Sequence, residues 1–471
     1  MHLDLDGQGA LQQQLVRALE AAIRHGRLPP GARLPTSRDL ARDLRIARNT
    51  ATLALEEIVA RGLARPEPRR GLFVNAQATP ADPGPASAAA PVKISRHLQP
   101  LVDEATRRDA AGVRHELSYG QPLVPPALWT AWRQALAKAS ERLPPDYPDP
   151  VGAPALRRAT ATWLAARRGL RVDADDIVIV SGAQQAFSLI ARVLIDEGDV
   201  VAIEDPHYDG ARLAFAAAGA RFHACAVDDE GLVVAQLPEA GARLVYITPS
   251  HQFPTGALLS PSRRAALLDW ATRCGALVIE DDYDGEFRYG AAPAPALHAL
   301  AGGRGVIYVG TWSKLLFPAL RLGYVVVPPA LRPAFAAAKR IDDRGSGVIE
   351  QLAVASLVAG GTVERHLRRL ARELERRRLA LTDALHTQGG GRITVEGIAA
   401  GMHVVARLHG VPWSRFEALR DAARAAGVNL DPVRPQFLPA TGDVAVLLGY
   451  SAAPPAAIAE AARLLCRIVA G

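Results

Sequence analysis

The sequence predicts a small basic module of three helices and a β-hairpin, followed by a large α/β domain with a mainly parallel sheet. Residues 1–75 contain 12 arginines, no lysine and 8 acidic residues, a net charge of +4. Residues 78–91 contain no large apolar side chain that could anchor them to a core, which is typical of a linker. Beyond them, short Val- and Ile-rich runs alternate with helical segments, as in α/β domains. We therefore expect a module over residues 1–77, a linker over 78–92 and a body over 93–471.

The composition indicates a folded cytoplasmic protein. Of its 471 residues, 49% are apolar and 22% are charged, which are ordinary values for a globular chain. Cys225, Cys274 and Cys466 lie far apart without a CxxC pair, so we expect neither a metal site nor a disulfide framework. The sequence has no secretory signal and no apolar run of about 18 residues, so we expect no contact with a membrane.

Hydrophobic periodicity predicts the three helices of the module. Leu15 and Leu19 belong to an apolar series at helical spacing within residues 8–25. Thr36 with Asp39 three positions later resembles a capping box, which begins a second helix over TSRDLARDL. A further apolar series at helical spacing predicts a third helix over about residues 47–61.

The end of the module points to a use for its third helix. Residues 63–75 place two strand-like runs around a turn that contains Arg69 and Arg70. Three short helices followed by such a hairpin form a helix-turn-helix with a wing, which lays its third helix in the major groove of DNA. The segregated arginines favour this interpretation. The alternative is a small helical docking domain with a solvated arginine face.

Short apolar runs predict the strands of the body. They are rich in Val and Ile, as expected for strands buried on both faces. The runs are DIVIV (176–180), VVAIE (200–204), RLVYIT (243–248), ALVIEDD (276–282), VIYVG (306–310) and RLGYVVV (321–327). Ligands of such sheets bind beyond the carboxyl ends of the strands, so the residues after these runs form the candidate site.

Two motifs at the strand ends suit an anionic ligand with a basic nitrogen. After the first run, Gly182, Ala183 and Gln184 begin a helix, whose free N–H groups and dipole attract a phosphate. Asp281 and Asp282 are consecutive acids at the end of the fourth run, where an unpaired carboxylate is costly. A salt bridge at the strand end and a bound cation are both open interpretations of this pair.

Lys314 is the strongest single candidate. Only four of the 55 basic residues are lysines, and Lys314 follows the fifth run in GTWSKLLFPALRLG. A lysine in a chain that otherwise uses arginine indicates a need for a primary amine, which can form a Schiff base. Ser313 and Arg321 are suited to hold a phosphate. Pyridoxal 5′-phosphate (PLP) combines the aldehyde, the phosphate and a ring nitrogen that an aspartate keeps protonated.

Longer motifs point to a family. The module contains LPPGARLPTSRDLARDLRIARNTATLALEEIVARGLA, and the body contains YPDPVGAPALR (147–157), SGAQQA (181–186), EDPHYDG (204–210), TPSHQFPTG (248–256), EDDYDGEFRY (280–289), TWSK (311–314) and ERHLRRLARELERRR (364–378). In this order they resemble the MocR/GabR subfamily of GntR-type transcription regulators. The similarity runs from Leu11 to about Tyr450, linker excepted. It implies a winged helix DNA-binding domain fused to a fold-type I, aminotransferase class I/II-like effector domain that binds PLP.

The resemblance implies a role for each matching residue of the body. Lys314 would hold the cofactor through a Schiff base, Asp281 would pair with the pyridinium nitrogen, and Tyr283 would hydrogen-bond the phenolic oxygen. Tyr208 would stack on the ring. Phosphate contacts are implied for Gly182, Ala183, Gln184, Ser313 and Arg321, and for Tyr147 from the second subunit of a homodimer.

The resemblance also implies the contacts of the module with DNA. Phosphate contacts are implied for Arg38 and Arg48, base reading for Arg48, Asn49 and Thr50, and wing contacts for Arg69 and Arg70. Ala47 departs from the family, which often has Ser there, and this removes an N-cap oxygen worth about 1 kcal/mol. The Arg-rich run 364–378 is interpreted as a packed helix with a solvated face rather than a second DNA track.

A second departure concerns the effector. Many relatives have an Arg before a [LI]-G-[FY] run to clamp a carboxylate, whereas VLLGYS has Leu447 and Leu448. No bidentate donor fork is available there, and Arg434 is a substitute only if its loop reaches the site. We therefore expect poor binding of amino-acid carboxylates, and the hypothesis, which resembles the PdxR branch, is that PLP itself is the signal.

These expectations define a function and two rivals. The predicted protein is a homodimeric regulator that binds a double-stranded operator, with PLP or a PLP–amine adduct at Lys314 as its effector, in vitamin B6 or amino-acid metabolism. One rival is a PLP-dependent aminotransferase with a fused DNA-binding module, which would have at most residual transaminase activity without the carboxylate-binding Arg. The other is a structural adaptor that has lost its cofactor.

Overall fold

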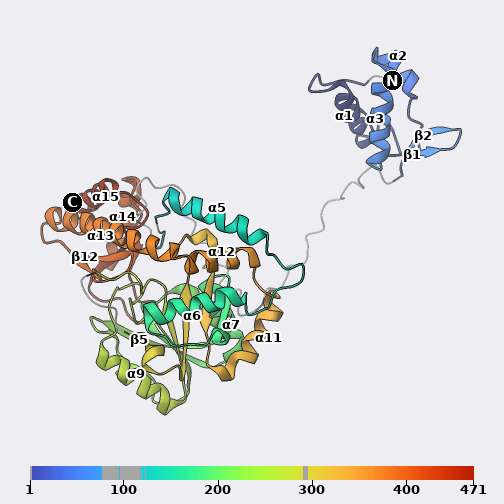
Figure 1. The fold of residues 1–471 in the computed structure, drawn as a ribbon. Coiled ribbons are helices and arrows are strands. Elements are labelled where there is room, and N and C mark those ends of the chain that lie inside the picture. Colours follow the sequence, from blue (N-terminus) through green and yellow to red (C-terminus); the bar gives the residue numbers. More distant parts are fainter. Residues whose placement is uncertain are drawn as a thin grey trace. The chain divides into compact units, whose positions relative to one another are not determined.

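The computed structural model of the chain describes residues 3–76, 95, 117, 119–121, 123–289 and 295–470. The chain divides into two compact units, Met1–Lys93 and Ile94–Gly471 (Figure 1). The expected linker over residues 78–92 lies outside the described residues. No described helix is long and apolar enough to cross a membrane.

The first unit has the three helices and the hairpin that the sequence predicts. They are α1 (Leu11–Arg24), α2 (Ser37–Leu44), α3 (Arg48–Ala60), and the antiparallel strands β1 (Ala64–Glu67) and β2 (Gly71–Val74). Leu15, Leu19 and Ile58 are fully buried in the core between α1 and α3. The predicted capping box is present at α2, because the Asp39 N–H donates to Thr36 Oγ1 at 3.2 Å.

The second unit is built on a mainly parallel sheet. Its strands are β3 (Ile177–Val180), β4 (Val200–Asp205), β5 (Arg221–Asp228), β6 (Gly231–Leu232), β7 (Ala242–Ile247), β8 (Leu277–Asp282), β9 (Val306–Thr311) and β10 (Gly323–Val326), in the order β3-β10-β9-β8-β7-β4-β5-β6. Five adjacent strands are parallel to one another: β5, β4, β7, β8 and β9. Strand β10 lies between β9 and β3 and is antiparallel to both. All six predicted strands are present, and the fold class is confirmed.

Helices cover both faces of this sheet, which explains why its central strands are mostly apolar. Successive residues of a strand point to opposite faces: in β3, Ile177 and Ile179 join one core cluster while Val178 and Val180 join another. The second cluster lies under α7 (Ala183–Leu194), α8 (Asp209–Ala217) and α11 (Arg332–Asp342). The opposite face packs against α6 (Pro154–Arg168), α9 (Pro261–Cys274), α10 (Leu297–Leu300) and α12 (Val348–Ala359).

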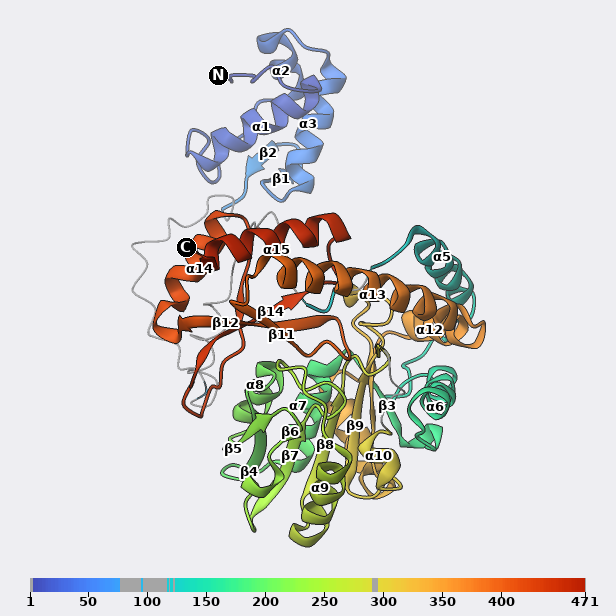
Figure 2. The same ribbon diagram turned by 90° about the vertical axis from the view of Figure 1, so that its left-hand side faces the viewer.

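A second sheet, not predicted from the sequence, closes the body toward its C-terminus. It orders β11 (Ile393–Glu396), β12 (His403–Pro412), β14 (Asp443–Gly449) and β13 (Asp431–Pro432), all antiparallel. Beside it run α13 (Thr362–Gln388), α14 (Phe416–Ala425) and α15 (Pro455–Ala470), and α5 (Pro126–Ser140) packs on α12 (Figure 2).

The Arg-rich run 364–378 lies within α13 and is partly packed. Arg377 is buried and donates to Glu373 at 2.8 Å, while Arg376 is exposed on the same helix. This is the packed helix with a solvated face that the sequence predicts.

Candidate functional site: a lysine pocket and an arginine-bearing helix

Nine of the ten predicted cofactor residues line one pocket at the carboxyl ends of the parallel strands. They arrive from separate strand ends: Gly182 after β3, Tyr208 after β4, Asp281 and Tyr283 at β8, and Lys314 after β9. The complete lining is Tyr119, Gly182, Ala183, Gln184, Tyr208, Phe253, Asp281, Tyr283, Thr311, Ser313, Lys314, Pro318 and Arg321. The pocket therefore lies at the edge of the sheet where ligands of α/β proteins usually bind.

The Lys314 ammonium lies inside this pocket in contact with backbone and an aromatic ring. Its Nζ donates to the Gly120 carbonyl at 2.9 Å and lies 5.4 Å from the ring centre of Tyr119. Burial lowers the pKa of Lys314, because a desolvated ammonium is disfavoured. A larger fraction of the side chain is therefore the neutral amine, the form that attacks a carbonyl.

One end of the pocket is suited to an anion. Helix α7 begins at Ala183 with Gly182 as its N-cap, and no side chain caps its free N–H groups. Arg321 lies against this helix end and donates to the Ser181 carbonyl at 3.1 Å. A Cβ on Gly182 would lie only 3.1 Å from the Arg321 guanidinium, so glycine allows the guanidinium and the helix end to converge.

The two strand-end acids have different partners. Asp282 forms a salt bridge with Arg168 at 2.6 Å, with both side chains 1% exposed, and it accepts from the Tyr308 hydroxyl. Asp281 faces the pocket and accepts from the Tyr246 hydroxyl at 2.7 Å. Burial raises the pKa of Asp281 to about 7. The salt-bridge interpretation therefore holds for Asp282, while Asp281 is a buried carboxyl that a cation would stabilise.

Aromatic side chains form a wall that the sequence did not reveal. Phe253 packs edge-on against Tyr208, with ring centres 5.7 Å apart. Its ring centre lies 4.8 Å from that of Tyr119. Tyr119 lies far from the strand-end motifs in the sequence, and no periodicity marks it. Phe253 lies in the segment TPSHQFPTG after β7, so inspection of every strand end could have found it.

Three residues considered in the sequence analysis are not among those that line the pocket. Tyr147 is 76% exposed and has the Arg344 guanidinium 5.8 Å from its ring centre. Arg434 is exposed over the Trp413 ring, so it does not replace the absent carboxylate clamp. Leu447 is 2% exposed within a small apolar cluster against which Tyr119 and Phe253 pack.

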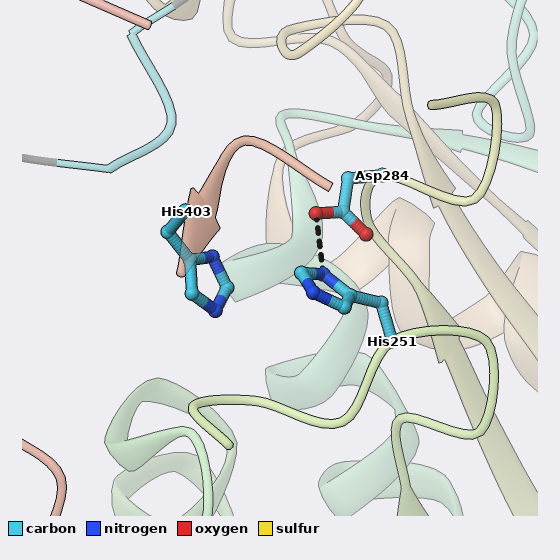
Figure 3. A group of neighbouring side chains, drawn as sticks. All are labelled: His251, Asp284 and His403. Carbon is cyan, nitrogen blue, oxygen red and sulfur yellow. Dashed lines mark hydrogen bonds and ion pairs between the residues drawn. The ribbon is translucent and has the colours of Figure 1, made fainter. Parts of the chain in front are cut away.

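A buried polar cluster lies behind this aromatic wall. His251 follows β7, Asp284 follows β8, and His403 begins β12 (Figure 3). One potential ligand atom from each lies within 4.8 Å of the others, a spacing that a metal ion could use. Their side chains are about 1% exposed or less. The sequence predicts no metal site, and it gave no sign that β12, far along the chain, would bring His403 to this place.

The predicted DNA-contacting residues occupy one helix start and one hairpin turn. Arg48 and Asn49 are exposed and Thr50 is half-buried in the first turn of α3. Arg38, Arg69 and Arg70 are exposed on α2 and on the turn between β1 and β2. Arg70 pairs with Glu67 at 2.6 Å, whereas among the described residues no acid pairs with Arg38, Arg48 or Arg69. Ala47 is the N-cap of α3 and gives it no side-chain cap.

Comparison with known proteins identifies both units. Residues 11–74 match the family described as bacterial regulatory proteins, gntR family. Residues 115–444 match aminotransferase class I and II. Among solved structures, the α-aminoadipate aminotransferase LysN of Thermus thermophilus, complexed with N-(5′-phosphopyridoxyl)-L-leucine, is 29% identical with a TM-score of 0.68. The similarity covers 78% of this chain and 97% of LysN.

Two relatives named as regulatory proteins match most of this chain. The probable rhizopine catabolism regulatory protein MocR of Rhizobium meliloti is 31% identical over 97% of this chain and 93% of its own length. The pyridoxine biosynthesis transcriptional regulator PdxR of Corynebacterium glutamicum is 31% identical over 84% of this chain and 83% of its own. The chain therefore belongs to the MocR/GabR subfamily of GntR-type transcription regulators, in which a winged helix DNA-binding domain precedes a fold-type I aminotransferase domain.

Proposed function

We propose that this chain is a cytoplasmic, homodimeric regulator whose affinity for an operator depends on PLP, or on a PLP–amine adduct, bound at Lys314. The observation that carries the proposal is the convergence of Lys314, Asp281 and Arg321 on one pocket, from the end of β8 and from the connection between β9 and β10. The proposed targets are genes of vitamin B6 or amino-acid metabolism. The similarity to PdxR supports the first of these.

The residues of the pocket fit PLP. The Lys314 amine, whose pKa is lowered by burial, suits an aldehyde, and the uncapped start of α7 with Arg321 suits a phosphate. Asp281 is a carboxyl whose pKa is raised by burial and by neighbouring acids, and a protonated pyridine nitrogen would stabilise its ionised form. When bound, PLP acts as an electron sink for carbanionic chemistry.

Each residue then has a stated task. Lys314 supplies the amine, and Asp281 holds the proton of the ring nitrogen, with Tyr246 fixing its carboxylate by a hydrogen bond. Tyr208 and Phe253 enclose the ring and exclude water. Gly182, Ala183, Gln184, Ser313 and Arg321 bind the phosphate.

The wall beyond the cofactor favours PLP itself as the signal. Leu447 occupies the place of the carboxylate clamp and is buried among Val405, Val433 and Ala445. An amino-acid carboxylate placed there would lose its hydration without gaining a charged partner. PLP alone should therefore change operator affinity, and a response only to PLP together with an amino acid would contradict this choice of effector.

A homodimer places two winged helices on two half-sites. Twofold symmetry of the protein then matches a palindromic operator. Tyr147 is exposed on its own subunit, as expected of a residue that contacts the phosphate in the partner subunit. The proposed DNA interface has three parts. Arg38 and Arg48 contact phosphates, and Asn49 and Thr50 read bases. The wing contributes contacts from Arg69 and Arg70.

The rival function is an aminotransferase, because an amine, an aspartate and a phosphate site are also what transamination needs. The apolar cluster around Leu447 argues against efficient turnover of amino acids. Steady-state turnover of an amino donor and a keto acceptor would favour the enzyme, whereas a tight, salt-sensitive shift of operator DNA favours the regulator.

The first experiment is the visible absorption spectrum of the purified protein with added PLP, compared with that of Lys314→Ala. We expect a band from the protein-bound Schiff base that survives dialysis in the wild type and is lost in the variant. Borohydride reduction followed by peptide mapping should place the label on Lys314. A label elsewhere, or a colourless wild type at saturating PLP, would overturn the proposal and favour the adaptor that has lost its cofactor.

A further inference from the structure

A hydrogen-bonded series leads from the buried polar cluster into the Lys314 pocket. Asp284 Oδ2 lies 2.9 Å from His251 Nδ1, and the same nitrogen lies 3.0 Å from the Tyr283 hydroxyl. Tyr283 lines the pocket. The series therefore joins a carboxylate that is 1% exposed to a hydroxyl that faces the proposed cofactor.

The partners of His251 decide where its proton lies. An ionised carboxylate can only accept hydrogen bonds. His251 Nδ1 must therefore carry a proton and donate the hydrogen bond to Asp284. The Tyr283 oxygen, close to the same nitrogen, can then act toward His251 only as an acceptor. A hydrogen bond from Tyr283 to Nδ1 would need that nitrogen to be unprotonated, which would leave the Asp284 carboxylate facing a lone pair.

This assignment leaves the Tyr283 proton available to the pocket. Burial, with the nearby Asp284 and Asp281 charges, raises the pKa of Tyr283 well above its usual range, so the hydroxyl keeps its proton at neutral pH. We propose that Asp284 and His251 are positioning residues that fix Tyr283 as a hydrogen-bond donor toward the ligand on Lys314. This inference rests on the proposed binding of PLP, whose phenolic oxygen is the acceptor implied for Tyr283.

The surroundings hold the His251 ring in this orientation. The His403 ring lies 4.7 Å from it, centre to centre, and His403 Nε2 is 3.2 Å from the Pro254 carbonyl, which fixes that ring in turn (Figure 3). A Cβ on Gly401, at φ +78°, would lie 2.0 Å from His251 Cε1 and 2.6 Å from Asp284 Oδ2. The close approach of this glycine keeps the imidazole and the carboxylate together.

The consequence is a change in the pH response of the bound cofactor. The proton on the Schiff-base nitrogen and the Tyr283 hydroxyl would share one phenolate oxygen, so a stronger donor at Tyr283 makes that nitrogen easier to deprotonate. Other charges that act on Lys314 are Asp281, Asp284 and Arg321, and these remain in place in the variants below. Deprotonation of the Schiff-base nitrogen would change the visible absorbance of bound PLP. Weakening Tyr283 as a donor should raise the pH midpoint of this absorbance change.

A matched pair of substitutions tests the position of the donor on residue 251. The side-chain amide of His251→Asn places an N–H near the Nδ1 position, whereas that of His251→Gln places it near Nε2. With PLP bound to the full chain, we expect the midpoint to stay near the wild-type value in His251→Asn. We expect it to rise by about one pH unit in His251→Gln, on the scale of one lost hydrogen bond to a charged group.

Tyr283→Phe completes a double-mutant cycle. It should raise the midpoint by at least as much as His251→Gln, and the double variant should show no further rise, because His251 acts through Tyr283. Additive shifts, or an unchanged midpoint in His251→Gln, would overturn the inference. Dialysis against a chelator should leave every midpoint unchanged, and a shift caused by the chelator would instead favour a metal ion at His251, Asp284 and His403.

The same spectra separate the two levels of the argument. If the wild type binds PLP at Lys314 but the shifts of the variants are additive, or the midpoint of His251→Gln is unchanged, only the positioning role fails. If no band forms on Lys314 in any of these proteins, the proposed function fails instead. Thermal unfolding of each variant without PLP identifies any that do not fold, and His251→Asn then serves as the folded reference.

Discussion

At the scale of single residues, neighbouring acids differ because the sheet gives them different surroundings. Asp281 and Asp282 are adjacent in the sequence, yet Arg168 neutralises Asp282, whereas Asp281 accepts a hydrogen bond from the Tyr246 hydroxyl. The sequence predicted that this pair of acids needs a partner, but it did not show which acid forms a salt bridge and which faces the ligand pocket. Arg168 ends α6, a helix whose position depends on packing against the whole sheet, and no local pattern encodes that.

Asp281 should make the cofactor-free protein less stable as the pH rises. Its folded pKa of about 7 lies above its ordinary value of 3.8, so the folded state binds a proton more tightly than the unfolded state does. The favourable contribution is therefore complete only below pH 3.8 and is lost progressively as the pH rises from there to about 7. Asp281→Asn removes this loss while keeping an acceptor for Tyr246.

Thermal unfolding without PLP checks this linkage. We expect Asp281→Asn to raise the Tm at pH 8 by at least a few degrees, since each kcal/mol is worth roughly 2–4 °C, and to raise it by less at pH 5, where only part of the stabilisation has been lost. PLP should bind this variant more weakly at both pH values, because the pyridinium loses its charged partner. Equal changes in Tm at pH 5 and pH 8 would contradict the assignment.

At the scale of elements, the start of the recognition helix is weakly built. Helix α3 begins at Arg48 with Ala47 as N-cap and no side-chain acceptor for its first N–H groups, in contrast to the capping box of α2. The side chains proposed to read DNA thus lie on a first turn that has no side-chain cap. The sequence predicted this directly, because capping depends on residue type at one position.

Restoring the cap should tighten the helix start. Ala47→Thr adds a cap oxygen, and Ala47→Val has the same shape without it. We expect Ala47→Thr to slow amide hydrogen exchange at Asn49 and Thr50 and to stabilise the module by about 0.5–2 kcal/mol, with tighter operator binding. Ala47→Val should do neither, and equal behaviour of the two variants would show that the cap is unimportant.

The wing should contribute one or more phosphate contacts. Arg69 is exposed without an acidic partner among the described residues, whereas Arg24 on α1 pairs with Glu20 at 2.6 Å. We expect Arg69→Ala to lower the slope of log K against log salt for operator binding by roughly 0.9 per lost phosphate contact. Arg24→Ala is the matched control and should leave the slope unchanged. Identical slopes for Arg69→Ala and the wild type would exclude the wing contact.

At the scale of the whole molecule, local patterns predicted the strands and the pocket but not what closes it. All six predicted strands and the carboxyl-edge site follow from runs of apolar residues with small or charged residues after them. The antiparallel direction of β10 and the sheet of β11 to β14 depend on long-range pairing, which carries no local signature. Tyr119 and His403 reach the pocket region through that tertiary arrangement, and the sequence analysis therefore missed them.

The proposed dimer makes a prediction about mixed subunits. If Tyr147 contacts the phosphate in the partner subunit, Tyr147→Ala homodimers should bind PLP more weakly. A heterodimer of a Tyr147→Ala subunit and a Lys314→Ala subunit should then regain one site of wild-type affinity, because the second subunit supplies Tyr147 to the Lys314 of the first. Titration of purified heterodimers checks this, and weak binding in the heterodimer would show that Tyr147 acts within its own subunit.

The most direct measurement of the account is operator affinity of the full-length protein with and without PLP, in the wild type and in Lys314→Ala. We expect PLP alone to change the wild-type dissociation constant by roughly 5- to 150-fold, the usual range of coupling between two sites, and to leave that of Lys314→Ala unchanged. The claim that PLP at Lys314 controls operator affinity would be contradicted by the same response in both proteins. It would also be contradicted if affinity did not change in a wild type whose spectrum shows PLP on Lys314.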